Sequence, residues 1–409
     1  MARPGLPHLD RSRFALIAAL AIDNYGSGLF LPLALLYATR VVDLGIDTAG
    51  TVVAVATALG FVVPPLAGRM THRLGPRLVV VTSQLLQAAG ALTYLVAGNA
   101  TGVFAAAALT AMGTQLFYCS IFVLVADVST STAKERPFAL VAMVRAGAFG
   151  LGTLTGALAL TWDSDAALQI LAGANAATFV VAGLLLAALV ETRPVDHDTP
   201  RGVGPLTVLR DRTYVALMAS VCLIDLADFA LVGVPIFLIE VVDGPTWLPG
   251  ALLATGTAMV SLGSVRVVDA LRGRRRTRSL QTSAAVYAAW ALLTMAMLWI
   301  PPAWLVPYAF ATWILRVLGS MGFFSIAGAL SENLPAPEQR AGYMATYQYA
   351  FTTAQVLAPA VVALFAVADW LPWVVLAVAA LVAVAILEWL GRAIPAEKNR
   401  APSLTAVRS

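Results

Sequence analysis

The chain has 409 residues, of which 60% are hydrophobic and only 12% are charged, and its mean hydropathy is +0.83. Soluble domains carry about 25% charged residues, so this composition excludes a water-soluble globular protein. The net charge of +4 comes from basic residues in short segments between apolar runs, which argues against a nucleic-acid-binding surface. Cys119 and Cys222 lie inside apolar runs and the three histidines are scattered, so no disulfide or metal site is indicated.

The apolar runs are long enough to cross a bilayer, which takes about 20 residues of helix. We predict an all-α integral membrane protein with twelve transmembrane helices, at 14–38, 49–69, 78–97, 101–126, 138–160, 167–190, 213–241, 247–268, 279–300, 303–330, 342–366 and 370–391. The first run shows no small-residue cleavage site, so we expect a retained span and not a signal peptide.

The basic residues orient these spans. An even number of spans places both termini on one side, and nearly all Lys and Arg residues fall there, whereas the opposite loops hold only Arg40 and several acids. By the positive-inside rule we expect both termini in the cytoplasm. The expected location is the cytoplasmic (inner) membrane of a bacterium.

The chain also reads as a duplication. We predict an N-terminal six-helix bundle over 1–190, a cytoplasmic linker over 191–212, a C-terminal six-helix bundle over 213–392 and a cytoplasmic tail over 393–409. Asp23 is followed nine residues later by Pro32, and Asp225 is followed ten residues later by Pro235. Such pseudo-symmetric halves are typical of a transporter whose site lies between the repeats.

The loop between the second and third predicted spans carries a motif. Residues 68–77 read GRMTHRLGPR. Gly68, Arg73, Gly75 and Arg77 match the loop pattern of the major facilitator superfamily, and His72 takes the place of its acid. The chain therefore resembles this superfamily over essentially its whole length, most closely its 12-span drug/proton antiporter branch. The alternative is a basic loop that only sets topology.

The resemblance implies a conformational latch. In the family this loop holds the two halves in the outward-facing state, with its arginine meeting an acid at the cytoplasmic end of the fourth span. Asp127 stands at that place and Arg136 lies across the following loop. With His72 in place of the acid, we expect a weaker or pH-sensitive latch. A second, shifted copy of the motif comprises Gly263, Asp269, Arg272 and Gly273.

Five charged residues lie inside predicted spans: Asp23, Arg145, Asp225, Asp228 and Arg316. A charge near the bilayer centre costs about 2.5–3.5 kcal/mol even on insertion scales, so these residues are candidates for function. At about 1.5 Å of rise per residue, Asp23 lies level with Arg145, and Arg316 lies level with the two later aspartates. Two arginine–carboxylate pairings are therefore plausible.

The resemblance places the first, fourth, seventh and tenth spans around a central cavity. A carboxyl group in an apolar cavity holds its proton more tightly, and a nearby arginine opposes this, so a substrate that displaces the arginine would alter proton binding. The alternative is permanent ion pairs that only fix helix packing. Polar candidates for the cavity are Asn24, Tyr25, Gln115, Tyr118, Tyr347, Gln348 and Gln355.

Two departures separate the chain from the antiporter branch. That branch usually carries an arginine in its fourth span, whereas residues 101–126 here have none and the similar RVLGSMG pattern begins at Arg316 in the tenth span. The branch also tends to carry a Gly-Pro pattern in its fifth span. This chain has Gly147, Gly150, Gly152 and Gly156 there without a proline, and these glycines allow close helix contact.

The leading hypothesis is proton-coupled efflux of a small amphiphilic drug or natural product by alternating access. The first alternative is proton-coupled uptake of a metabolite, and the second is a non-transporting membrane sensor or scaffold. We expect no enzymatic activity and no cofactor, because no nucleotide loop, metal cluster or nucleophile–base spacing occurs. The expected partners are a small-molecule substrate, protons and the lipid bilayer, with no nucleic acid, and the expected state is a monomer.

Overall fold

The computed structural model describes residues 7–129, 135–159, 164–192, 204–245, 247–271 and 273–400. Residues 193–203 of the predicted linker, the last nine residues of the predicted tail and the Arg272 position lie outside these residues. Within them the chain is helical, and the only bridge of β type joins Arg275 to Arg400. The fold is therefore all-α, as the sequence predicts.

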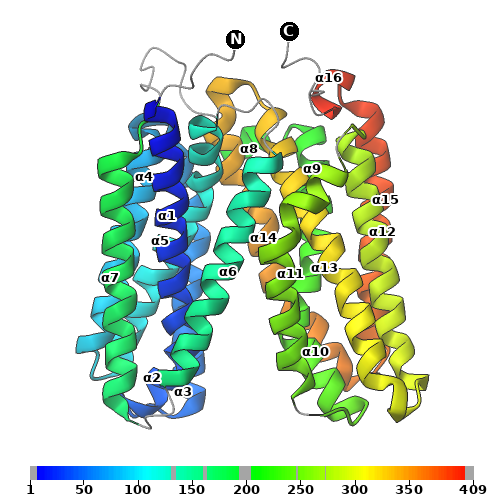
Figure 1. Ribbon diagram of the computed structural model, residues 1–409, viewed down its shortest axis with the longest axis horizontal. Helices are drawn as coiled ribbons and strands as arrows, with labels where there is room; N and C mark the ends of the chain where they lie inside the picture. Colours follow the sequence, from blue (N-terminus) through cyan, green and yellow to red (C-terminus); the bar gives the residue numbers. More distant parts are fainter. Residues whose placement is uncertain are drawn as a thin grey trace. The chain divides into compact units, whose positions relative to one another are not determined.

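Long helices alternate with short helical pieces along the chain (Figure 1). The α-helices are α1 (Pro7–Phe30), α2 (Ala34–Arg40), α3 (Ile46–Ala58), α4 (Val63–Val96), α5 (Ala100–Val128), α6 (Glu135–Ala159), α7 (Asp165–Leu189), α8 (Pro205–Val208), α9 (Arg212–Asp225), α10 (Ala230–Ile236), α11 (Leu248–Ala270), α12 (Arg276–Met295), α13 (Pro302–Asn333), α14 (Arg340–Ala363), α15 (Leu371–Ala393) and α16 (Ala396–Asn399).

Ten helical segments in the described residues are long and apolar enough to cross a membrane, where the sequence predicts twelve spans. The second and third predicted spans are counted together as the 49-residue segment Thr48–Val96. This segment turns at Gly75, whose φ of 80° is a left-handed conformation that glycine adopts without a Cβ penalty. The seventh predicted span is divided into α9, a 3₁₀ turn (Leu226–Phe229), α10 and a π-helical turn (Phe237–Val241), each too short to count alone.

Side chains at helix starts explain several boundaries. Asn99 accepts a hydrogen bond from the Gly102 amide at the start of α5, and Asp211 accepts from the Thr213 and Tyr214 amides at the start of α9. The first amides of a helix have no partner within the helix, so such caps each contribute about 1 kcal/mol.

The helices form two compact units. The first comprises Met1–Thr130, Val144–Pro205 and Pro337–Gln348, and the second comprises Ser131–Met143, Leu206–Ala336 and Tyr349–Ser409. These units follow the predicted bundles except at α6 and α14, each of which begins in one unit and ends in the other. The exact bundle limits of the sequence stay a prediction.

The core of the first unit holds a cluster of aromatic rings. Phe30, Tyr37 and Tyr94 meet edge to face at centroid distances of 5.1–5.6 Å, and the Tyr37 hydroxyl donates to the Tyr94 carbonyl at 2.9 Å. Edge-to-face aromatic pairs contribute about 0.5–1.5 kcal/mol beyond their buried area. The cluster joins α1, α2 and α4.

Close contact between α1 and α6 depends on glycine. A Cβ added at Gly152 would collide with the Tyr25 carbonyl and would lie 3.1 Å from the Gly28 Cα, and one at Gly28 would collide with the Phe149 carbonyl. The expectation that glycines of the fifth predicted span allow close helix contact is confirmed at Gly152.

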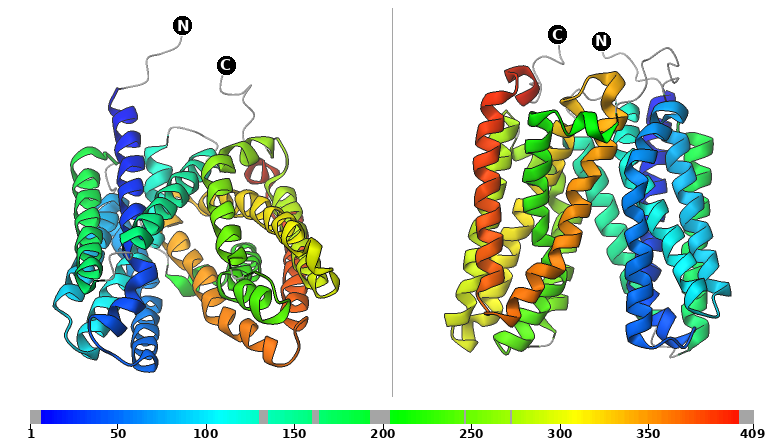
Figure 2. Two further views of the ribbon diagram at one scale, coloured as in Figure 1. Left: turned by 60° about the horizontal axis from the view of Figure 1, so that its bottom comes forward. Right: turned by 180° about the vertical axis from the view of Figure 1, so that it is seen from behind.

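In the second unit, α9, α12 and α15 lie side by side (Figures 1 and 2). Trp290 of α12 and Trp373 of α15 are fully buried against each other, with ring centroids 5.9 Å apart. Phe237 packs on Trp373 at 4.8 Å. These rings form the centre of the second core.

The end of the chain caps α12. Asn399 accepts a hydrogen bond from the Thr277 amide at 3.0 Å, and its own amide donates to the Thr277 hydroxyl at 3.0 Å. Lys398 donates to the Leu334 carbonyl at the end of α13 at 2.6 Å. Residues 398 and 399 therefore tie the end of α13 to the beginning of α12.

Candidate functional site

A polar network lies inside the first unit. Asp23 and Asn24 of α1 are 5% and 7% exposed, and the Asn24 amide nitrogen donates to the Asp23 carboxylate at 3.2 Å and to the Leu20 carbonyl at 2.9 Å. The rest of α1 around them is apolar, which keeps water from competing for these hydrogen bonds.

Arg145 of α6 completes the network. Its Nε donates to Asn24 Oδ1 at 3.2 Å, and its Nη2 donates to the Tyr118 hydroxyl at 2.6 Å. The guanidinium also lies over the rings of Phe117 and Tyr118, 5.5 and 4.8 Å from their centroids. Stacking on aromatic faces and fixed donors are properties of arginine that lysine lacks.

The predicted pairing of Asp23 with Arg145 is therefore indirect. Asn24 stands between them and accepts from the guanidinium while it donates to the carboxylate. The carboxyl of Asp23 faces Gln84 of α4 instead. Gln84 is fully buried, and neither of its amide atoms completes a hydrogen bond in the described part of the chain.

A second arginine is held in the second unit. Arg316 of α13 donates to the Ala227 carbonyl at 3.2 Å and lies over the rings of Trp290 and Trp313, at 5.4 and 4.9 Å. Ala227 lies in the 3₁₀ turn that interrupts the seventh predicted span. Irregular backbone inside a membrane needs a protein donor or acceptor, and Arg316 supplies one.

Of the two acids predicted beside Arg316, the structure describes the side chain of Asp225 and not that of Asp228. Asp225 is the last residue of α9 and is buried, at 6% exposure. Asp228 lies in the same 3₁₀ turn, but its side chain lies outside the described ones. The proposed pairing of Arg316 with one of these acids stays a prediction.

The remaining cavity candidates are distributed over α1, α5 and α14. The Tyr25 hydroxyl donates to Thr155 Oγ1 at 3.3 Å, and Gln115 is half-buried. Tyr347 and Gln348 are buried at the beginning of α14, whereas Gln355 is exposed further along it. Two of the cavity candidates, Asn24 and Tyr118, form hydrogen bonds with Arg145, a predicted intramembrane charge.

The loop motif packs tightly in the first unit. A Cβ added at Gly68 would lie 3.1 Å from Ala345 Cβ, and Cys119 and Ala345 share one apolar cluster. Arg77 donates to the Ala187 carbonyl of α7. Gly68 therefore supports close contact between α4 and the beginning of α14.

His72 and Arg73 of the predicted latch are not fully buried. Arg73 is exposed and His72 is half-buried, and the described residues show no hydrogen bond or ion pair from Arg73 to Asp127. The latch role of these residues stays a prediction.

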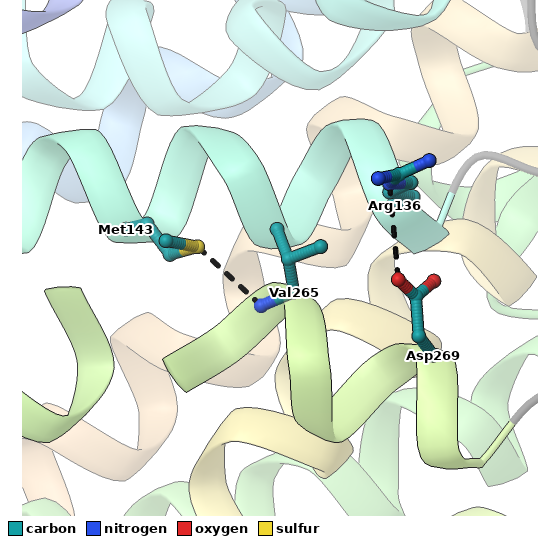
Figure 3. A network of polar contacts seen from close by, with 4 residues as sticks. All are labelled: Arg136, Met143, Val265 and Asp269. Carbon is teal, nitrogen blue, oxygen red and sulfur yellow. Dashed lines mark hydrogen bonds and ion pairs between the residues drawn. The ribbon is translucent and has the colours of Figure 1, made fainter. Parts of the chain in front are cut away.

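Arg136, the last residue of the predicted latch, lies near an acid of α11. Its Nε lies 3.9 Å from the Asp269 carboxylate of α11 (Figure 3), and Asp269 belongs to the shifted second copy of the motif. Two turns along α6, Met143 Sδ accepts from the Val265 amide at 3.4 Å (Figure 3). The first turns of α6 thus pack along α11 within the second unit.

These features define a class of protein. Helices that cross a membrane carry half-buried arginines and buried carboxylates in both compact units, and such residues mark substrate or ion pathways in membrane transporters. The sequence profile of the Major Facilitator Superfamily matches residues 14–313. The chain belongs to this superfamily and is a transporter, not an enzyme.

Relatives refine this assignment. The chain is 30% identical over 154 residues to the multidrug resistance protein MdtH of Cronobacter sakazakii, a match that covers 37% of each chain. It is 28% identical over 182 residues to MdtH of Edwardsiella ictaluri, a match that covers 44% of each chain. The chain thus covers less than half the length of these relatives.

Solved structures share the fold. A bacterial homologue of the iron transporter ferroportin in an outward-facing state has a TM-score of 0.78 and 14% identity, covering 93% of this chain and 100% of that one. The human organic anion transporter MFSD10 has a TM-score of 0.75 and 14% identity, with the same coverage. Identities this low show the fold alone.

Sequence reasoning missed Gln84 and the bridging position of Asn24. Gln84 is a polar residue inside the third predicted span, at 78–97, and a polar residue inside an apolar span is a candidate for a functional site. Asn24 was expected in a cavity, but its place between two charges depends on how α1 is rotated.

Proposed function

We propose that the protein is a proton-coupled exporter of small amphiphilic compounds that works by alternating access. It acts in a bacterial cytoplasmic membrane with both termini in the cytoplasm, as a monomer, and the proton gradient drives it without a cofactor. The observation that carries the proposal is the buried network in which Asn24 links the Asp23 carboxylate to the Arg145 guanidinium.

The network couples two charges through one amide. With Asp23 ionised, the carboxylate accepts from Asn24 and its charge attracts Arg145. When Asp23 binds a proton, that attraction is lost and the Asn24–Arg145 contact loses its electrostatic support. Proton binding at Asp23 thereby changes how Arg145 is held over the rings of Phe117 and Tyr118.

A substrate competes for the same surface. Phe117 and Tyr118 present aromatic faces that Arg145 occupies, and a hydrophobic or cationic compound binds such faces well. A compound that displaces Arg145 from these faces drives the guanidinium toward Asp23, where it favours the ionised carboxylate and loss of the proton. Proton binding at Asp23 releases Arg145, which returns to the aromatic faces and expels the compound, so that compound and proton are exchanged as export requires.

Similarity supports the substrate class. The partial relatives are named multidrug resistance proteins, which supports a drug as the exported compound. The superfamily fold itself is shared with transporters of different named substrates, so it does not choose among them.

Two helices suit an alternating motion. Residues 135–143 at the beginning of α6 belong to the second unit and its remainder to the first, while α14 is divided the opposite way. The contact that holds the beginning of α6 includes an exposed ion pair at 3.9 Å. Exposed pairs contribute about 0–1 kcal/mol, so this contact is weak enough to break in each cycle.

The proposal is tested by a resistance profile in a bacterial strain that lacks its own efflux pumps. Export predicts that expression lowers accumulation of one or more amphiphilic dyes, and that collapse of the proton gradient restores it. The Asp23→Asn variant should lose this effect, whereas the matched Asp369→Asn variant, at an exposed loop acid, should keep it. Increased accumulation of a metabolite would instead establish uptake and overturn export.

A further inference from the structure

A groove lies between α9 and α15 of the second unit, with a volume of about 620 Å³. Its apolar lining includes Val215, Ala216 and Ala219 of α9 and Ala385 and Ile386 of α15. Three of these five side chains are alanine, so the two helices pack side by side but leave a furrow along their seam. The lining is separate from the residues of the Arg316 site.

The groove opens on a surface that lies in the bilayer. Leu381 and Val382, about one turn before the groove on α15, are exposed apolar side chains. Because α15 is a membrane-crossing segment of high hydropathy, exposed apolar side chains on it contact lipid tails. An acyl chain is therefore the apolar group nearest to the groove.

One end of the groove is cationic. Arg212, the first residue of α9, lines the groove, is exposed, and makes no side-chain hydrogen bond or ion pair with the described residues. The neighbouring Asp211 carboxylate accepts from the Thr213 and Tyr214 amides as the cap of α9. Arg212 thus keeps its donors available to a ligand.

The other groups at this end fit a lipid headgroup. Trp389 lines the groove and is 47% exposed, and tryptophan side chains settle at the level of lipid headgroups. Arg392, one turn further along α15, forms an ion pair with Glu388, so these two charges cancel. Arg212 is the charged residue that lines the groove beside Trp389.

We infer that this groove binds an anionic phospholipid, with one acyl chain along the alanines and the phosphate on Arg212. Arginine donors match phosphate oxygens, and the apolar furrow matches the chain. Basic residues at the predicted cytoplasmic end face the leaflet that carries anionic lipids. Because the lipid contacts both α9 and α15, it stabilises the second unit by binding only the folded state.

Native mass spectrometry of the purified full-length protein tests this inference. The probes are phosphatidylglycerol, which is anionic, and phosphatidylethanolamine, which is zwitterionic. The wild type should retain phosphatidylglycerol in preference, and Arg212→Gln should weaken that binding about five-fold, the effect expected for one arginine at an anionic lipid surface. Arg278→Gln, at an exposed arginine on the first turn of α12, should leave the binding unchanged.

A second variant tests the acyl-chain position without altering charge. Ala216→Phe should fill the furrow and reduce retention of the lipid, while the melting temperature measured without lipid confirms that the variant folds. Equal retention of both lipids by wild type and Arg212→Gln would overturn the inference. So would dimerisation through this face. None of these outcomes depends on whether the protein exports drugs.

Discussion

Arg145 reaches Asn24, not Asp23: its Nε lies 3.2 Å from Asn24 Oδ1, and Asn24 in turn donates to Asp23 at 3.2 Å. The amide is the only side chain in this chain of contacts that both accepts and donates. It therefore transmits a change of charge at the carboxylate to the guanidinium, and every prediction on coupling depends on it.

The hydrogen bond from Arg145 to Tyr118 is charge-assisted, and its loss should be costly. Tyr118→Phe removes a 2.6 Å contact and should lower the free energy of unfolding by about 1.5–3 kcal/mol, the range for hydrogen bonds to charged groups. Thermal unfolding in detergent measures this. Tyr25→Phe is the matched control, because it removes only a 3.3 Å bond between neutral hydroxyls. Equal losses for both variants would show that Arg145 does not depend on Tyr118.

The glycine contact between α1 and α6 should not accept a larger side chain. Gly152→Val places carbon atoms against the Tyr25 carbonyl and Gly28, so the two helices must separate and the protein should fail to accumulate in the membrane. Gly173→Ala is the control, since its added Cβ meets nothing closer than Leu95 Cδ1 at 3.9 Å. Normal yield of monodisperse Gly152→Val protein would contradict this packing.

How far the sequence predicts this site can be seen at Asp23 and Asn24. The rise per residue correctly predicts that this part of α1 is level with Arg145, because depth depends only on counting. Direction does not follow from counting: adjacent residues on a helix point about 100° apart. The sequence therefore could not decide which of the two faces Arg145, or that Gln84 lies beside Asp23.

The fold is easier to predict from the sequence than the arrangement of the site. Apolar length alone predicts the spans, because a helix in lipid must satisfy its own backbone. The sequence does not predict two details of the fold. One is the interruption of the seventh predicted span, where Arg316 of α13 donates to the irregular backbone. The other is the cap of α12 by Asn399. Both depend on partners far away in the sequence.

The cap from the chain end should contribute measurably to stability. Asn399→Ala removes the acceptor for the Thr277 amide and should cost about 1 kcal/mol, as for other helix caps. A double-mutant cycle with Thr277→Val measures the coupling between the two side chains through the melting temperature. Since they bond each other, the double variant should lose less than the sum of the single variants. Strict additivity would show that they act independently.

The ion pair of Arg136 with Asp269 should affect transport more than stability. The side chains are 59% and 37% exposed, so Arg136→Asp should change the free energy of unfolding by less than about 1 kcal/mol. It should nevertheless slow transport, because like charges oppose packing of α6 on α11. The reversed pair, Arg136→Asp with Asp269→Arg, should recover the rate. Failure of the reversed pair to improve on either single variant would exclude a role for this contact in the cycle.

The central claim is that Asp23 exchanges a proton when substrate displaces Arg145. The direct measurement is the pH change on adding an exported compound to purified protein in weakly buffered detergent. Proton release is expected from the wild type and not from Asp23→Asn, which should still bind the compound. Proton uptake by the wild type, or proton release by Asp23→Asn equal to that of the wild type, would contradict the account.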